Sequence, residues 1–231
     1  MFMNENVTAI IVSAGKGTRM GSEIPKQYMT IAGKTILDTT LYKFDRDKLV
    51  DEIILVVNKE DIDFVREEIA CNYDKVSMVL KGGKTRTESV YEGIKRLSKY
   101  CKVVLIHDGV RPFISYRLIN TCIEKAYKYK ACIPVIDVVD TIKEVQNGCV
   151  EKTLDRSMLK AVQTPQVFDA ELIRNCYERV VNEDYDINFT DDASIVEYYG
   201  HKVKTVEGLS RNIKITTPLD LRIAEIFASI Y

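Results

Sequence analysis

At 231 residues the chain is long enough to bury one large core, and its 46% hydrophobic and 29% charged residues are ordinary for a globular protein. Its 33 basic and 34 acidic residues give a net charge of −1, so composition favours neither nucleic acid nor an anionic membrane as a partner. No run of about 18 apolar residues occurs, and the opening MFMNEN lacks a charged segment followed by an apolar one. We therefore expect a cytoplasmic protein without a signal peptide or a membrane span.

The six cysteines are scattered without a C-x-x-C motif, and the sequence contains only two histidines. A zinc site therefore has few available ligands. The cysteines are expected to be reduced thiols, as is typical of cytoplasmic proteins.

The first predicted element is a buried strand at Val7–Val12, a short apolar run rich in β-branched residues. It ends at a small-residue turn in which Gly15 and Gly17 leave room for a phosphate to approach backbone N–H groups. Arg19 and Lys26 flank the turn, and two cations there favour a polyphosphate over a small anion. A glycine turn is also common as plain chain geometry, so the turn alone leaves both interpretations open.

Two familiar phosphate-binding motifs are excluded. The dinucleotide fingerprint G-x-G-x-x-G requires a third glycine where the chain has Met20. Its acidic residue has a counterpart only in Asp38, which lies inside a predicted helix. The chain also lacks the G-x-x-x-x-G-K-[ST] sequence of P-loop proteins.

Downstream of this turn, helix and strand patterns alternate. The predicted helices are 34–44, 61–70, 87–99 and 117–129, and the predicted strands are 52–58, 76–80, 103–107 and 131–135. This alternation is typical of βαβ units, so we expect a Rossmann-like α/β fold with a mostly parallel sheet and helices on both faces. Ligands bind beyond the carboxyl ends of such strands, where the glycine turn, Gly82-Gly83 and His107-Asp108 all lie.

The succession of helices and strands ends before residues 137–156. In this segment apolar and polar residues alternate on either side of Asn147-Gly148. Asn-Gly suits a type I′ turn, so this segment predicts a β-hairpin. Because the hairpin is too polar for the core, we expect a protruding arm that pairs with a second copy of the chain.

The remaining pattern predicts helices at 169–181 and 218–230, a helix capped by Thr190, a strand at 203–207, and a strand or its approach at 212–216. The sequence shows no internal repeat, low-complexity tract or linker. We therefore expect a single domain spanning residues 1–231.

Asp108 follows a buried strand beside the predicted phosphate site. One carboxylate, water and phosphate oxygens form the ligand set that Mg²⁺ prefers, although an aspartate at this point also serves simply to turn the chain. His107 is expected to be a packed, hydrogen-bonded residue rather than a base.

Five cations are predicted at strand ends, turns or the arm, and each alone is typical of a solvated surface charge. Together they favour a clamp for phosphate groups: Arg19, Lys26, Arg111, Arg156 and Lys214. No nucleophilic Ser or Cys with an adjacent base and no paired carboxylates are recognised, which is consistent with phosphoryl or nucleotidyl transfer. A phosphate monoester with a second pKa near 6 would attack without a general base.

Seven segments occur in order between residues 13 and 225: SAGKGTRMGSEIPKQY, GGKTRTESV, HDGVRPF, VVDTIKEV, LDRSMLKAVQTPQVF, FTDDASIVEYYG and EGLSRNIKITTPLDLRIAE. Together they closely resemble the 2-C-methyl-D-erythritol 4-phosphate cytidylyltransferases of non-mevalonate isoprenoid synthesis. The resemblance implies a homodimer with exchanged arms, a Mg²⁺ ion, CTP and a sugar-alcohol phosphate as substrates, and release of diphosphate.

The resemblance also assigns roles to individual residues. It places the CTP phosphates against Ala14, Gly15 and Gly17, the cytidine against Gly83 and Ser89, and Mg²⁺ on Asp108. It makes Arg19 and Lys26 stabilisers of charge at the α-phosphorus, and counts Arg156 and Lys214 with them as catalytic. It gives the sugar-alcohol phosphate to a set in which Thr141, Arg156 and Thr164 come from the partner subunit: Arg111, Thr141, Arg156, Thr164 and Lys214.

The chain departs from the family pattern at three places. Ser13 replaces the usual alanine and is a mild change, Lys84-Thr85 leaves the details of base recognition open, and Gly109-Val110 leaves the substrate contacts open. Ribitol-5-phosphate cytidylyltransferases share the glycine turn, PKQ, the arm and NIKITTP, whereas FTDDAS and LDR favour the erythritol enzyme. A non-catalytic nucleotide-binding protein of the same fold is a further alternative, and a nicotinamide-dependent oxidoreductase is a distant third.

Overall fold

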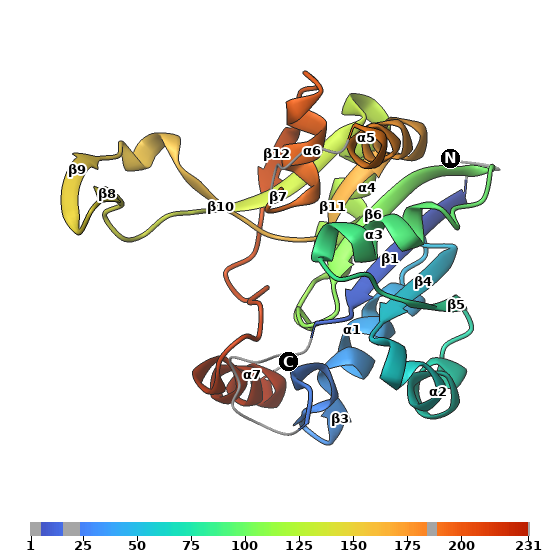
Figure 1. Ribbon diagram of the computed structural model, residues 1–231. Helices are drawn as coiled ribbons and strands as arrows, with labels where there is room; N and C mark the ends of the chain where they lie inside the picture. The colour runs from blue at the N-terminus through green and yellow to red at the C-terminus, as the bar shows by residue number, and fades with distance from the viewer. Residues whose placement is uncertain (1–5, 16–23, 184–188, 231) are drawn as a thin grey trace.

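The computed structural model describes residues 6–15, 24–183 and 189–230. Its centre is a sheet of eight strands: β1 (Asn6–Ser13), β4 (Glu52–Val57), β5 (Val76–Lys81), β6 (Cys101–Asp108), β7 (Ala131–Asp137), β10 (Lys160–Val162), β11 (Gln166–Asp169) and β12 (Lys204–Glu207). The strand order is β10-β7-β11-β6-β1-β4-β5, with β12 paired to β7 (Figure 1). Strands β6, β1, β4 and β5 are parallel, so their carboxyl ends meet at one edge.

Helices cover both faces of the sheet. On one face lie α1 (Ile36–Asp45), the helical segment 59–72 that contains α2 (Ile62–Phe64), and α4 (Tyr116–Tyr129). On the other face lie α3 (Arg86–Ile94), α5 (Ala170–Asn182) and α6 (Asp192–Tyr198). The last helix, α7 (Pro218–Ile230), packs instead beside the short strands β2 (Thr30–Ile31) and β3 (Lys34–Thr35). This arrangement confirms the predicted α/β fold.

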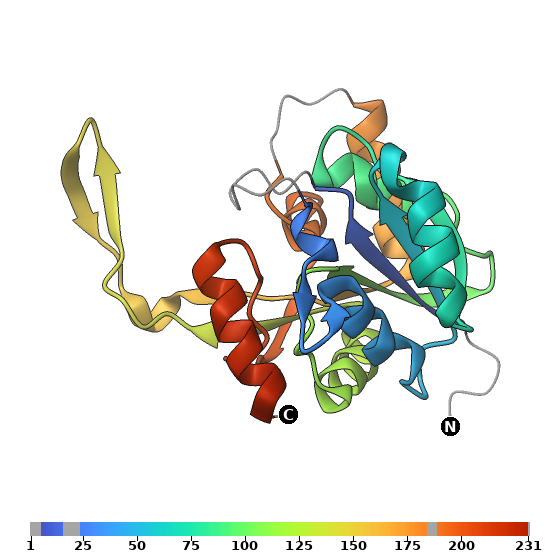
Figure 2. The same cartoon turned by 90° about the horizontal axis from the view of Figure 1, so that it is seen from below.

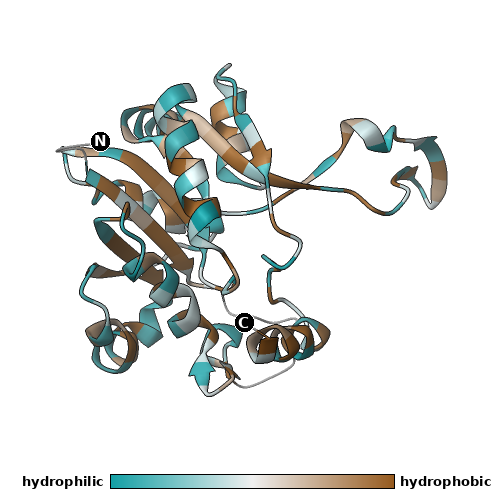
Figure 3. Cartoon of the chain, turned by 180° about the vertical axis from the view of Figure 1, so that it is seen from behind, coloured by the Kyte–Doolittle hydropathy of each residue, from teal (hydrophilic) through white to brown (hydrophobic). Residues whose placement is uncertain are grey.

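The apolar runs that predicted the central strands are explained by burial on both faces. In β1, Ile11 packs in the core beside α1 and α4, whereas its neighbour Ile10 packs in the core beside α3 and α5, and both are fully buried. Successive side chains of a strand point to opposite faces, so a strand covered on both sides is apolar at most of its positions. Figure 3 shows the central strands as mostly hydrophobic.

The structure corrects several local predictions. The short strands β10 and β11 were missed, and β11 lies antiparallel between β6 and β7. The helix at 192–198 is capped by the Asp191 side chain, which accepts from the Ser194 N–H, and not by Thr190. Residues 212–216 form no strand, and their buried core residue, Ile215, packs beside α7. These elements are short, so tertiary neighbours rather than periodicity determine them.

The predicted arm is a β-hairpin of β8 (Lys143–Gln146) and β9 (Cys149–Thr153), which pair only with each other. Asn147 and Gly148 both have positive φ angles, 50° and 79°, as the type I′ turn requires. Figure 2 shows the hairpin projecting well away from the sheet and its helices.

Within the described ranges, no helix has both the length and the apolar character needed to cross a membrane.

His107 ties together the loops at the carboxyl end of β6. His107 Nε2 lies 3.1 Å from the Arg111 carbonyl, which can only accept, so Nε2 carries the proton of the neutral ring and donates it to this carbonyl. Nδ1 is then an acceptor and receives the Thr164 hydroxyl proton at 2.9 Å, while Thr164 Oγ1 accepts from the Asp108 N–H at 3.2 Å. Burial lowers the pKa of His107 to about 4, although its hydrogen bond to Arg111 opposes the shift. His107 is therefore a neutral, buried, hydrogen-bonded residue, as predicted.

This lowered pKa predicts a loss of stability in mild acid. The unfolded chain protonates His107 near its ordinary pKa of 6.5, whereas the folded chain resists protonation until about 4. Stability from this residue is therefore complete above pH 6.5 and is lost as pH falls toward 4. Between about pH 7.5 and about pH 5 we expect the free energy of unfolding to fall by about 2 kcal/mol on this account.

Urea denaturation at the two pH values, on the wild type and on His107→Gln, measures this contribution. The variant should be less stable at neutral pH but should lose less stability on acidification. His201→Gln, at the exposed second histidine, is the control and should keep the wild-type pH dependence. An unchanged slope in His107→Gln would show that other groups cause the acid sensitivity.

Candidate active site

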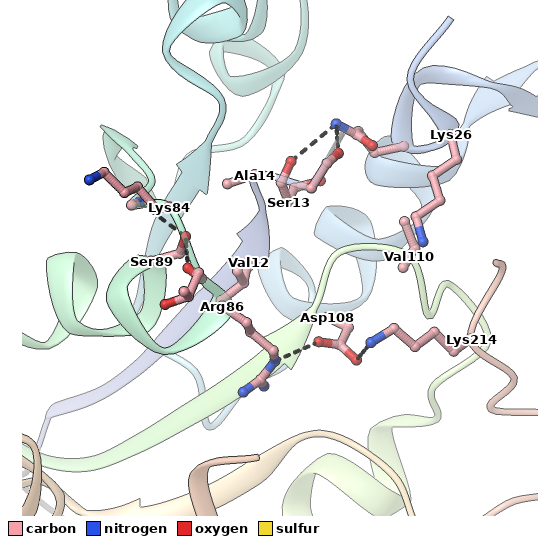
Figure 4. A pocket seen from close by; sticks show the side chains of 14 residues that line it. Val12, Ser13, Ala14, Lys26, Lys84, Arg86, Ser89, Asp108, Val110 and Lys214 are labelled. Atoms are coloured by element: carbon pink, nitrogen blue, oxygen red, sulfur yellow. Dashed lines mark hydrogen bonds and ion pairs between the residues drawn. The ribbon is translucent and has the colours of Figure 1, made fainter. Parts of the chain in front are cut away.

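A pocket with a volume of about 210 Å³ opens at the carboxyl edge of the parallel strands. Its walls come from the ends of β1 and β6, the turn after β5, the start of α3, the short helix Lys26–Tyr28 and the segment before α7 (Figure 4). The lining residues are Val12, Ser13, Ala14, Gly15, Lys26, Gln27, Gly83, Lys84, Thr85, Arg86, Ser89, Asp108, Val110 and Lys214. The pocket thus gathers most of the residues that the sequence marked as functional within one chain.

The start of the glycine turn is held in place by Gln27. Its side-chain Nε2 donates to the Ser13 carbonyl at 3.1 Å and to the Gly15 carbonyl at 3.4 Å, and Gln27 is only 2% exposed. Because the carbonyls are turned toward Gln27, Ala14 and Gly15 line the pocket with a fixed backbone. No sequence pattern indicated a role for Gln27, although it adjoins Lys26 in the segment SAGKGTRMGSEIPKQY. Gly17 and Arg19 lie outside the described residues.

The second glycine pair is required by close packing. A Cβ atom on Gly82 would lie 2.4 Å from the Ala14 Cβ, and one on Gly83 would lie 2.3 Å from the Glu88 Cβ. The Gly83 N–H donates to Ser89 Oγ at 3.1 Å, and the Ser89 hydroxyl donates to the Thr85 carbonyl. Gly83 and Ser89, both predicted to contact cytidine, therefore form one hydrogen-bonded wall of the pocket.

Asp108 is a buried carboxylate at the centre of the charged groups of the pocket. It is only 6% exposed, and three cations surround its carboxylate. Lys214 Nζ lies 2.9 Å and Arg111 Nε 3.5 Å from Oδ2, while Arg86 Nε lies 3.3 Å from Oδ1. Burial raises the pKa of Asp108, but the charges of Arg86, Lys214 and Arg111 outweigh burial and hold this pKa well below its usual range. The carboxylate is therefore ionised at any physiological pH.

Arg86 connects the pocket to a buried anchor that sequence reasoning missed. Its Nη2 lies 2.8 Å from Oδ2 of Asp192, which is fully buried at the start of α6. The Tyr177 hydroxyl donates to the other Asp192 oxygen at 2.5 Å. Both Arg86 and Asp192 lie within quoted motifs, but Asp192 was interpreted only as an acidic residue in the first turn of a helix. The 106 positions between them concealed their contact.

The substrate residues predicted for the same chain are brought together. Lys26 and Lys214 line the pocket, and Arg111 is held between Asp108 and the Asn212 carbonyl, to which its Nη1 donates at 2.8 Å. Thr164 is also here, 5% exposed and bonded to the backbone of Asp108 in its own chain. The expectation that Thr164 reaches a partner subunit is therefore wrong, because this residue is fixed beside its own pocket.

Thr141 and Arg156 are not brought to this pocket. Both are exposed on the arm, and Arg156 Nη1 donates to the Val139 carbonyl, also on the arm. The arm points away from the pocket of its own chain (Figures 1 and 2). These two residues stay predictions for a site formed with another subunit.

The donor atoms suit a cation that is shared with a ligand. No group of three or more His, Cys, Asp or Glu side chains able to hold a metal occurs in the part of the chain that the structure describes. Asp108 alone offers a carboxylate among the residues lining the pocket. Mg²⁺ fits such a site, because it commonly binds one or two carboxylates together with water and substrate phosphate oxygens.

Comparison with known sequences gives the family. The model of the family described as "IspD: 2-C-methyl-D-erythritol 4-phosphate cytidylyltransferase" matches residues 7–229. A relative from Bacteroides fragilis with that enzyme name is 48% identical over 220 residues, covering 94% of this chain and 97% of the relative. One from Clostridium novyi is 45% identical over 220 residues, covering 94% of each chain.

Solved structures agree in fold. The crystal structure of 4-diphosphocytidyl-2C-methyl-D-erythritol synthase from Anaerococcus prevotii has a TM-score of 0.86 and 36% identity, covering 98% of this chain and 97% of that one. The enzyme from Francisella tularensis has a TM-score of 0.82 and 32% identity, covering 96% and 99%. The pocket described above thus sits in a chain that belongs to the 2-C-methyl-D-erythritol 4-phosphate cytidylyltransferase family.

Proposed function

We propose that this protein transfers CMP from CTP to 2-C-methyl-D-erythritol 4-phosphate and releases diphosphate. The observation that carries the proposal is the pocket that joins the glycine turn, Lys26, Asp108, Arg111 and Lys214 at one sheet edge, in a chain of this family. The six cysteines are all free thiols, which supports a cytoplasmic location.

The reaction needs positioning and charge more than proton transfer. An ionised oxygen of the substrate phosphate attacks the α-phosphorus of CTP, and the bond from that phosphorus to the bridging oxygen breaks as diphosphate leaves. A phosphate monoester with a second pKa near 6 is largely ionised at neutral pH, so no base is required. This agrees with His107, whose ring is buried and committed to two hydrogen bonds.

The described residues divide this work. In this proposal the CTP phosphates bind against the backbone at Ala14 and Gly15 and the cytidine binds against Gly83 and Ser89, all four of which line the pocket. Lys26 supplies positive charge toward the α-phosphorus, where negative charge develops in the transition state. Arg111 and Lys214 bind the phosphate of the second substrate. Asp108 would hold Mg²⁺, which would supply positive charge to offset the negative charge of the CTP phosphates.

Asp108 also changes partners in this scheme. In the structure its Oδ2 is engaged by Lys214 and Arg111, the two residues assigned to the second substrate's phosphate. Occupation of Oδ2 by a cation would free both side chains for that phosphate. The same carboxylate therefore links the two halves of the substrate site.

The arm carries the final part of the proposal, a homodimer with a shared site. Three arm residues expose large fractions of their apolar side chains, Val139 (80%), Val145 (58%) and Val150 (61%), and so does Met158 (81%) just after the arm. Apolar side chains on a projecting hairpin are typical of a surface that a partner covers. On a second chain, Thr141 and Arg156 would reach the substrate phosphate in the first chain's pocket.

The activity is tested by measuring diphosphate release from CTP with 2-C-methyl-D-erythritol 4-phosphate and with ribitol 5-phosphate in parallel. We expect turnover with the erythritol phosphate and a much lower kcat/KM with the ribitol phosphate. Efficient turnover of ribitol phosphate alone would assign the chain to the alternative activity. Tight CTP binding without turnover of either substrate would support a non-catalytic nucleotide-binding protein.

The shared site is tested by complementation between Lys26→Ala and Arg156→Ala. Each homodimer should be nearly inactive, because both of its sites carry the lesion. In a heterodimer one site carries both lesions and the other neither, so random association should restore about a quarter of wild-type sites. The two variants are unfolded, mixed, refolded, checked for heterodimers by mass and assayed for diphosphate release.

Wild type taken through the same protocol controls for refolding. Lys152→Ala, at an exposed lysine of the arm, controls for damage to the arm and should stay active. No recovery in the mixture of Lys26→Ala and Arg156→Ala, with heterodimers present, would place Arg156 in the site of its own chain or outside any site.

A further inference from the structure

The guanidinium of Arg86 is shared between two carboxylates of different exposure. Asp108 lies at the wall of the pocket, whereas Asp192 is fully buried behind it. Arg86 Nη2 lies 2.8 Å from Asp192 Oδ2, and Arg86 Nε lies 3.3 Å from Asp108 Oδ1. The closer contact is therefore with the residue that no ligand reaches.

Asp192 is built as a rigid anchor. Its carboxylate oxygens are taken by Tyr177 and Arg86, and its backbone N–H donates to Gln166 Oε1 at 2.9 Å. Gln166 Oε1 also accepts from the N–H of Ala193, the next residue of α6. A buried polar group with every partner in place is costly to move, so Asp192 fixes the outer end of the Arg86 side chain.

We propose that Asp192 is a positioning residue that holds Arg86 at one oxygen of Asp108, so that the other oxygen, which Lys214 and Arg111 contact in the structure, can pass to a divalent cation in the pocket. The proposal rests on the proposed function for the identity of that cation site. Figure 4 shows the arrangement, with Arg86 and Lys214 on opposite sides of the Asp108 carboxylate.

The geometry explains why the anchor matters. A guanidinium fork pairs with both oxygens of one carboxylate when it is free to do so. If Asn replaced Asp192, the Arg86 guanidinium would have Asp108 as its only carboxylate partner in the cluster. Asp108 would then be a poorer ligand for a cation. The cluster would also gain one net positive charge, since Arg86, Arg111 and Lys214 would then face a single carboxylate.

The test measures metal binding rather than turnover. Mn²⁺ is titrated into the CTP-bound protein and followed by electron paramagnetic resonance, with Mn²⁺ standing in for Mg²⁺. Asp192→Asn should weaken Mn²⁺ binding by about tenfold, the size expected for losing one nearby charge at intermediate dielectric. Asp191→Asn is the matched control, because Asp191 is the neighbouring carboxylate and makes no ion pair with Arg86; it should bind Mn²⁺ as the wild type does.

A second variant separates positioning from folding. Arg86→Gln combined with Asp192→Asn removes both charges together and leaves no unpaired buried charge, so it should fold even if the single variant does not. If Asp192 acts through Arg86, this double variant should bind Mn²⁺ at least as tightly as the wild type. Mn²⁺ binding that is unchanged in Asp192→Asn, or much weakened in the double variant, would overturn the proposal. Failure of the proposed function would appear separately, as normal Mn²⁺ and CTP binding without diphosphate release in the wild type.

Discussion

The carboxylate of Asp108 and the three cations around it form the interaction on which the site depends. A carboxylate that is 6% exposed is stable as an anion only when opposite charges replace the water it has lost. Those charges come from the start of α3, from the turn after β6 and from the segment before α7. The cluster therefore joins three distant stretches of chain at the edge where the parallel strands end.

The cluster also explains how one pocket serves two phosphate-bearing substrates. Both Asp108 oxygens are occupied in the structure by three cationic side chains, and two of them, Arg111 and Lys214, are the ones proposed to bind a substrate phosphate. The third, Arg86, is held from behind by Asp192. Lys214 and Arg111 thus pair with Asp108, and Arg111 also with the Asn212 carbonyl, whereas Arg86 has a fully buried partner in Asp192.

The sequence carried enough information for the framework and for the residues at strand ends. Ile10 and Ile11 lie in a continuous apolar run because β1 is covered on both faces, and such runs are recognisable without a structure. Asp108 and the glycine turn follow directly from this pattern, since parallel strands end at a common edge. Asn147-Gly148 specified the hairpin because few other dipeptides accept two positive φ angles.

Contacts between residues far apart in the sequence could not be predicted from local sequence patterns. The Arg86–Asp192 pair joins residues 106 positions apart, and nothing in either local pattern marks the other. Strand β11 has only four residues and pairs antiparallel with β6, so neither length nor alternation revealed it. Thr164 was assigned to the wrong subunit for the same reason: its place beside Asp108 follows from β11, which begins two residues later.

A crystal structure of the protein with CTP and Mg²⁺ bound would test most directly whether Asp108 exchanges a side-chain cation for the metal ion. We expect Asp108 to contact the metal ion in place of Lys214, while Arg86 stays paired with Asp192. The Lys214 side chain should point toward the binding site of the second substrate. A complex in which Asp108 keeps its contact with Lys214 while the metal is held by other side chains would contradict this expectation.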